Sequence, residues 1–218
     1  ASDFYKKHDV GMAEICLPSA ADAAAPLRHA GRYLSEFNQG RFTGLKAQAE
    51  QLAMARPHED LSKKFRYNQR RELRLLEEAG GVVRPINDFS AIEVATMYCD
   101  LFQRRWGFPA TGAERMVDVL QRLRELLIGS VVLLDDNPIA IQLVYRVEAP
   151  HWISVEYVNG GVDPETKAFS PGSVLSFLNT QAAWEDAQAR NKPLRFSFGR
   201  ADREYKDRWC NPVPVFQA

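Results

Sequence analysis

The chain has 218 residues, with 28 Lys plus Arg and 28 Asp plus Glu, so its formal net charge is zero. Such a chain has no net charge that would attract it to nucleic acid or anionic membranes, and contact with either requires a local basic patch. The three cysteines and four histidines lack the spacing of a disulfide framework or a zinc site. No run approaches the roughly 18 apolar residues of a membrane span, and the first residues do not resemble a signal peptide. We expect a cytoplasmic globular protein without a bound metal.

Residues 1–57 are predicted to form an N-terminal extension. Within it, Val10 to Leu17 favours a short strand, and Pro18 to Pro26 is rich in alanine and is typical of a linker. Leu45 to Arg56 predicts a helix that stops at Pro57, because proline lacks an N–H and restricts the residue before it.

A second helix is predicted from Leu61 to Ala79, ending at the glycines that follow. Four basic residues step along it by three, four and four and so share one face: Lys63, Arg66, Arg70 and Arg74. Two interpretations stay open for this face. It is either a solvated helix surface, or a contact for an anionic partner such as the phosphates of tRNA or membrane headgroups.

Two capping boxes predict the next helices. Ser90 with Glu93 and Thr111 with Glu114 have the spacing at which a hydroxyl and a carboxylate cap one helix start. The helices are expected to stop at Gly107 and Gly129. Apolar residues recur between these points at helical spacing, which indicates faces that pack on the core.

The residues after Gly129 change to the alternation of strands. Ser130 to Leu134 and Ile139 to Glu148, joined by a turn sequence, predict a hairpin. A third strand is predicted from His151 to Val158, with Glu156 in its middle. That carboxylate is either a solvent-facing or salt-bridged residue, or a general base tuned by an apolar neighbour.

The glycines after this strand predict its end and a loop toward Ser170. Ser170 suits a helix N-cap, Pro171 the first helical position and Gly172 a close approach of ligand to backbone. Such a helix start is either an ordinary surface cap or an anion site. The helix is expected to end by Arg190, and the next strand, 194–198, should lie parallel to the third because a helix joins them.

Two segments carry a resemblance to a known family: LSKKFRYNQRRELRLLEEAGG and RFSFGRADREYKDRW, the latter following the Ser170 helix. Together they resemble GNAT-like acyltransferases of the FemAB and cellulose-biosynthesis-related type, and most closely the Mig family of antimicrobial-peptide-resistance proteins. The resemblance implies an α/β (α+β) fold over 58–218, in which helices flank a mixed sheet and two parallel strands splay apart around the donor. The extension before it would be the remnant of a preceding half-domain.

The resemblance also implies roles for residues. Glu156 would be the general base and Tyr205 the acid that protonates the leaving group. The donor, acyl-coenzyme A or aminoacyl-tRNA, would be held by residues at the helix start and after the next strand: Ser170, Gly172, Ser173, Val174, Arg200 and Lys206.

The function implied is transfer of an acyl or aminoacyl group to an amine or hydroxyl of an envelope component, by a cytoplasmic protein or one peripheral to the inner membrane. Related sequences carry an aspartate and a glycine where this chain has Ser197 and Ala201. A second interpretation is therefore a catalytically silent relative that binds an anionic partner through the basic helix.

Overall fold

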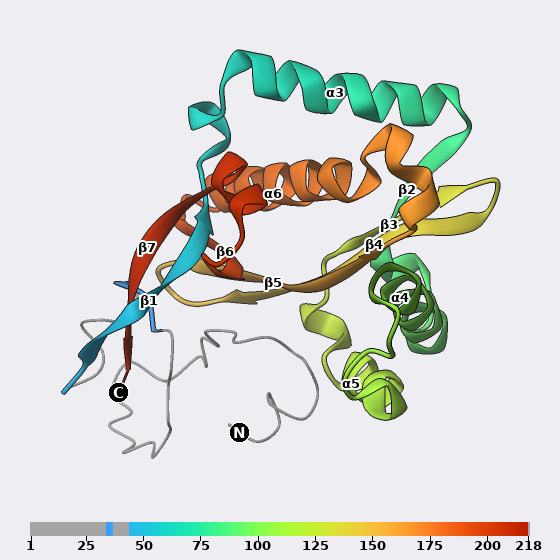
Figure 1. The fold of residues 1–218 in the computed structure, drawn as a ribbon. Helices are drawn as coiled ribbons and strands as arrows, with labels where there is room; N and C mark the ends of the chain where they lie inside the picture. The colour runs from blue at the N-terminus through green and yellow to red at the C-terminus, as the bar shows by residue number, and fades with distance from the viewer. Residues whose placement is uncertain (1–33, 37–43, 218) are drawn as a thin grey trace.

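A computed structural model describes residues 34–36 and 44–217, and within them one seven-stranded sheet is flanked by helices on both faces (Figure 1). The strands are β1 (Lys46–Ala55), β2 (Gly81–Pro85), β3 (Ser130–Leu134), β4 (Asn137–Glu148), β5 (Ile153–Val162), β6 (Leu194–Arg200) and β7 (Cys210–Gln217). The α-helices are α3 (Lys63–Glu78), α4 (Ala91–Trp106), α5 (Met116–Arg122) and α6 (Pro171–Ala189). The predicted strand over 10–17 and linker over 18–26 lie outside the described residues.

The strand order is β2-β3-β4-β5-β6-β1-β7. Neighbouring strands in this order run antiparallel except β5 and β6, which are parallel and joined through α6. The hairpin of β3 and β4 and the parallel pair are both confirmed. The predicted GNAT-like arrangement, a mixed sheet flanked by helices with a parallel pair that splays apart, is therefore the observed one.

The helix predicted from Leu45 to Arg56 is wrong, because this segment is strand β1. It pairs with β6 on one side and β7 on the other, as in the register Leu52 with Val213. Its residues, KAQAEQLAMA, have high intrinsic helix propensity, but insertion between two strands supplies ladder hydrogen bonds on both edges and buries Leu52 and Ala53. This part of the 1–57 segment belongs to the same sheet as the residues that follow it.

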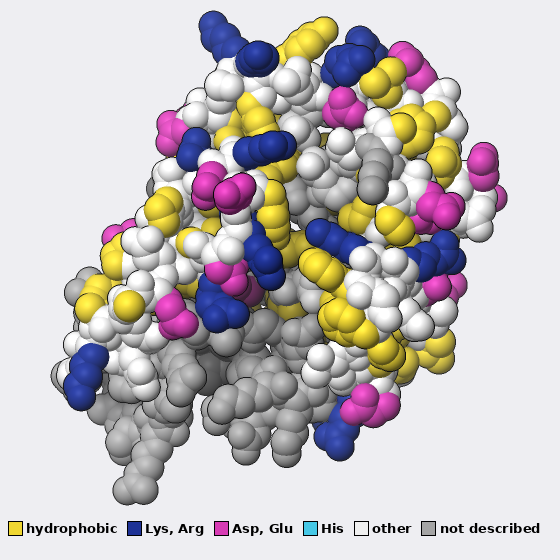
Figure 2. Space-filling view, in the orientation of Figure 1, with side chains coloured by type: hydrophobic (Ala, Val, Ile, Leu, Met, Phe, Trp, Pro, Cys, Tyr) yellow, Lys and Arg dark blue, Asp and Glu magenta, His cyan; other side chains and the backbone are white. Residues whose placement is uncertain are grey.

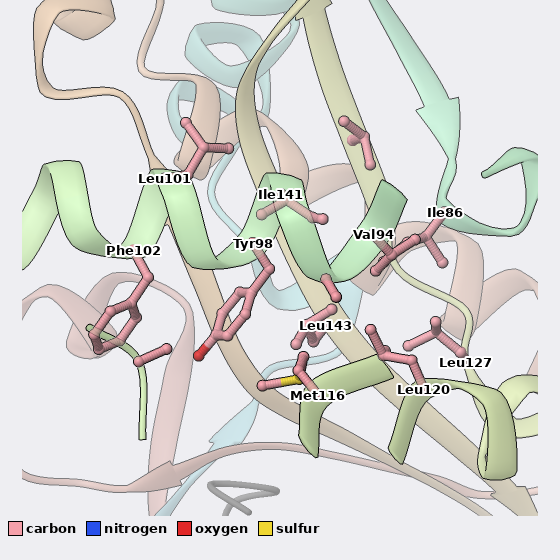
Figure 3. Packing of buried hydrophobic residues seen from close by; sticks show 13 residues of the cluster. Ile86, Val94, Tyr98, Leu101, Phe102, Met116, Leu120, Leu127, Ile141 and Leu143 are labelled. Carbon is pink, nitrogen blue, oxygen red and sulfur yellow. The ribbon is translucent and has the colours of Figure 1, made fainter. Parts of the chain in front are cut away.

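The helices form two layers that the sheet separates (Figure 1). On one face α4 and α5 cover β3, β4 and β5 with a buried apolar cluster, in which Tyr98 and Leu101 of α4 lie over Ile141 and Leu143 of β4 (Figure 3). On the opposite face α6 packs on the sheet, and α3 packs on α6 as an outer layer. The joint between α3 and α6 is therefore distant from α4 and α5.

Capping explains one of the two predicted helix starts. The Ser90 hydroxyl accepts a hydrogen bond from the Glu93 N–H, and the Glu93 carboxylate accepts one from the Ser90 N–H, so this capping box is confirmed. The second predicted capping box, Thr111 with Glu114, does not start an α-helix. Gly112 has a φ of 76° and is followed by a 3-10 turn, and α5 begins at Met116 and ends at Arg122, well before Gly129.

Candidate functional site

The candidate site lies where the parallel strands β5 and β6 diverge. Their pairing ends at the register Glu156 with Ser197. Beyond that point β5 follows β4 as far as Val162, while β6 turns to β1, with Arg200 opposite Leu52. The two strands therefore stop pairing in the middle of the sheet, and we call the place where their carboxyl ends diverge the opening.

Strand β5 does not end at Asn159, so the prediction that the glycines break it is wrong. Against β4, Tyr157 lies opposite Val144 and Asn159 opposite Leu143, which leaves Val158 as an extra residue, a β-bulge. Gly161 then brings the strand close under α4, since a Cβ at this position would lie 2.5 Å from the Leu101 Cβ. The glycines serve close packing, and the bulge bends β5 away from β6.

Two tyrosines and an arginine, Tyr157, Tyr205 and Arg105, lie within electrostatic range of one another near this opening. The ring of Tyr157 lies 5.2 Å from that of Phe198 on β6. Burial raises the pKa of Tyr157, and the nearby Tyr205 raises it further while the Arg105 charge opposes the change. Burial likewise raises the pKa of Tyr205, again against Arg105. Both phenols are therefore protonated at neutral pH, and Tyr205, 49% exposed, is open to a ligand.

Glu156 lies on the opposite face of β5 from Tyr157, within a buried polar cluster. Its Oε2 accepts a hydrogen bond from Arg195 Nη1 at 3.0 Å, and its Oε1 accepts one from the Ser197 hydroxyl at 3.0 Å. The same Arg195 nitrogen also donates to the Ser154 hydroxyl. Of the two interpretations from sequence, the salt-bridged residue is the one observed, but in the interior, with only 4% of Glu156 exposed. The role of this carboxylate as a base stays a prediction.

The start of α6 is built from backbone rather than from side-chain capping. Ser170 is the N-cap, but its φ and ψ of 45° and 46° are left-handed and its hydroxyl makes no cap bond. Its carbonyl instead accepts from the N–H groups of Ser173 and Val174. Since Pro171 has no N–H, Gly172 is the residue of this first turn whose N–H has no acceptor within the helix. A Cβ on Gly172 would lie 2.9 Å from a Val162 methyl, so this helix start is seated on the end of β5.

The remaining residues predicted to bind the acyl or aminoacyl donor lie in two places, the core and the turn after β6. The side chain of Val174 is fully buried, so only its backbone belongs to the helix start. Lys206 lies in the 3-10 turn η6 (Glu204–Arg208), where its Nζ donates to the Arg200 carbonyl at 2.6 Å and approaches Asp202 at 3.5 Å. Arg200 itself lies near carboxylates of Glu50 and Asp202. These contacts stabilise the turn after β6.

The predicted residues therefore form separate groups. Figure 1 shows the start of α6 at the far end of β5, whereas η6 lies toward the other end of α6. Tyr205 is close to Tyr157, whose side chain and that of its neighbour Glu156 point to opposite faces of the strand. Figure 2 shows a recess in this view between the side that carries β1 and the side that carries α4, with Lys and Arg side chains on both rims.

Three residues of the site were not predicted from sequence: Tyr157, Arg105 and Arg195. Tyr157 lies within the strand predicted over 151–158, and its phenol is at the opening only because the strands diverge beside it. Arg195 could have been found from the parallel pairing, which places it opposite Ser154 and diagonal to Glu156.

Among the described residues, no group of three or more His, Cys, Asp and Glu side chains is arranged to hold a metal ion. None of the helices in the described ranges combines the length and apolar character needed to cross a membrane.

Fold and site together define a mixed α/β protein. In it, the parallel strands β5 and β6 are joined by helix α6 and diverge where β5 has a bulge. The sequence model of the Mig-14 family matches residues 4–218. The chain belongs to the Mig-14 family. A search of curated proteins finds no match.

Three solved structures share the fold. The C-terminal DUF2156 domain of a protein assigned as a lysylphosphatidylglycerol synthetase from Agrobacterium fabrum has 12% identity and a TM-score of 0.57, over 85% of this chain and 65% of that one. The L-PGS from Bacillus licheniformis has 11% identity and a TM-score of 0.52, over the same shares. A conserved protein of unknown function from Bacteroides thetaiotaomicron has 13% identity and a TM-score of 0.52, over 79% and 60%. This chain spans less than two thirds of each.

Proposed function

We propose that this protein is a transferase that moves an acyl or aminoacyl group to an amine or hydroxyl of a cell-envelope component. The observation that carries the proposal is the opening between β5 and β6, with two protonated tyrosines and an arginine at its edge. A phenol beside a cation suits a reaction in which a leaving group takes up a proton.

The structural neighbours support the same class of chemistry. Two of them are named for lysylphosphatidylglycerol synthesis, which joins a lysyl group to a lipid. For this chain we propose acyl-coenzyme A or aminoacyl-tRNA as the donor and an envelope lipid or a related envelope molecule as the acceptor. Modification of this kind makes an envelope less attractive to cationic peptides, which is consistent with the predicted role in antimicrobial-peptide resistance. The more specific FemAB-type relationship stays a prediction.

Tyr205 is the proposed acid. The acceptor nitrogen or oxygen bonds to the donor carbonyl carbon, the bond to the donor's sulfur or ribose oxygen breaks, and the Tyr205 proton goes to that leaving atom. The acceptor gives up its own proton to solvent, and solvent returns a proton to the Tyr205 phenolate. Arg105 lies close enough to both phenols to stabilise negative charge that develops there.

Both carboxylate oxygens of Glu156 already accept a hydrogen bond, Oε2 from Arg195 and Oε1 from Ser197. Its observed contacts hold the two strands together at the last paired position, immediately before they diverge. We therefore propose that the first role of Glu156 is to position β5 relative to β6.

A turnover assay tests this function. Labelled donor and membranes are incubated with the protein, and transfer of the label is measured. Tyr205→Phe should lower the rate by roughly 10² to 10⁴ while leaving the fold intact, because the side chain is half exposed. Tyr67→Phe, at an exposed tyrosine on α3, is the matched control and should not change the rate. No transfer by the wild type with any donor, or equal rates for the two variants, would contradict the proposal.

One observation favours the second candidate, a binding protein for an anionic partner. On α3, Lys63, Lys64 and Arg70 have no ion pair with any residue that the structure describes, whereas Arg74 pairs with Glu78 at 3.6 Å. Arg66 is turned inward and donates to the carbonyls of His58 and Glu59. A binding protein predicts affinity that falls steeply with salt and is insensitive to Tyr205→Phe.

A further inference from the structure

A groove of about 420 Å³ lies between α3 and α6, on the layer of the molecule farthest from α4 and α5. Its residues come from α3, from α6 and from the 3-10 turn η1 (His58–Asp60) that precedes α3. They are His58, Glu59, Arg66, Arg70, Gln181, Trp184, Glu185 and Gln188. Since the α6 residues belong to the second half of that helix, the groove is separate from the helix start and from the opening between β5 and β6.

Two polar atoms behind this groove have no hydrogen-bond partner among the described residues. They are Nε2 of His58 and the indole Nε1 of Trp184, and both are buried. A buried polar atom without a partner is unfavourable, so two of them beside one groove point to a ligand that would supply their hydrogen bonds. The indole N–H can only donate, so its partner must offer an acceptor atom.

The positive and the negative charges lie on different walls of the groove. Arg66 and Arg70 lie on the α3 wall, whereas Glu59 and Glu185 lie on η1 and α6. Burial lowers the pKa of His58, the charges of Arg66 and Arg70 lower it further, and Glu185 and Glu59 oppose them. The imidazole is therefore neutral at pH 7, and an anion bound beside it would favour its protonated form. His58 is held in place by its ring contact with Phe177, at 5.3 Å.

We propose that the groove between α3 and α6 binds a small ligand through an oxyanion group, a phosphate ester or a carboxylate, held by Arg70 and Arg66 beside the indole of Trp184 and the imidazole of His58. The indole offers a flat apolar surface for the body of the ligand. The carboxylates of Glu59 and Glu185 limit the ligand to few negative charges, which disfavours polyanions such as RNA. This is a binding site additional to the proposed transferase site.

Nuclear magnetic resonance on the intact chain tests the proposal, with inorganic phosphate, methyl phosphate and acetate as probes and sodium chloride at matched ionic strength as reference. His58→Asn and Trp184→Phe assign the two signals. The probe that binds should shift the Trp184 indole N–H signal in a saturable way and move the His58 titration up by about one pH unit. Comparison of the phosphate and acetate titrations identifies the oxyanion.

Two arginine variants complete the test. Arg70→Gln should weaken binding about tenfold or more, because a charge-assisted hydrogen bond is lost. Arg74→Gln changes the same charge on the same helix, at a residue paired with Glu78 outside the groove, and should leave affinity unchanged. The proposal is overturned if none of the probes shifts the His58 and Trp184 signals beyond the chloride reference, or if both arginine variants have the same effect. Neither result depends on transferase activity.

Discussion

Glu156 on β5 and Arg195 on β6 form an ion pair of 3.0 Å across the parallel strands, with Arg195 fully buried. Glu156 belongs to the last register position before the strands separate, opposite Ser197, and Arg195 reaches it diagonally from its own position opposite Ser154. Burying two charges costs several kcal/mol, so this contact is a poor source of net stability and a good means of fixing geometry. It fixes the position from which β5 and β6 diverge, and with it the placement of Tyr157 and Phe198.

Removal of both partners should therefore cost less than the two single removals added together. We expect Glu156→Gln and Arg195→Gln each to lower the free energy of unfolding by about 3–5 kcal/mol, and the double variant to lose clearly less than the sum. Urea denaturation measures all three. Glu78→Gln, which breaks an exposed pair, is the control and should cost less than about 1 kcal/mol. Additive losses would show that the two side chains do not act as a pair.

The close approach of β5 to α4 makes a second prediction. Gly161→Ala places a Cβ 2.5 Å from the Leu101 Cβ and 3.0 Å from its backbone carbonyl carbon, so a helix has to move. We expect a loss of about 1–3 kcal/mol in thermal or urea unfolding. Gly172→Ala meets only a valine methyl, at 2.9 Å, which a small side-chain rotation relieves, and should cost less. The reverse order would mean that the NGG segment does not pack as described.

A third prediction concerns acid stability. Hydrogen bonds from Lys192 and Arg146 lower the pKa of Glu148 to about 2 from its ordinary 4.5. Because the folded pKa is the lower one, the contribution of Glu148 to stability is complete above about pH 4.5 and is lost as the pH falls toward 2. Glu148→Gln should thus be less stable than the wild type at pH 7, with a difference that shrinks across this window. Unfolding curves measured from pH 7 to 2 give the comparison, and a constant difference would contradict it.

Local chemistry made much of the fold predictable. The Ser90 capping box, the hairpin of β3 and β4, and the parallel pair joined by a helical crossover all follow from short-range patterns. The failures share a cause in tertiary structure. β1 has the composition of a helix but is a strand, because β6 and β7 pair with it on both edges. Asn159 to Gly161 has the composition of a turn but continues β5, because α4 packs against it.

The site was predictable only in part. Ser170 and Glu156 were found from their positions on a helix start and a strand. The contacts that define their chemistry, Arg195 with Glu156 and Tyr157 with Tyr205, join residues far apart in sequence and depend on the register and the bulge. No spacing in the sequence encodes them directly.

The most direct test of the central claim is donor binding, measured as thermal stabilisation of the chain by acetyl-coenzyme A, longer acyl-coenzyme A species and charged tRNA. One donor at about one hundred times its Kd should stabilise the fold by about 2.7 kcal/mol. Arg105→Gln, at the opening, should reduce that stabilisation, while Arg74→Gln on the outer face of α3 should not. If none of these donors raises the melting temperature, or if the two variants respond alike, the opening between β5 and β6 is not a donor site.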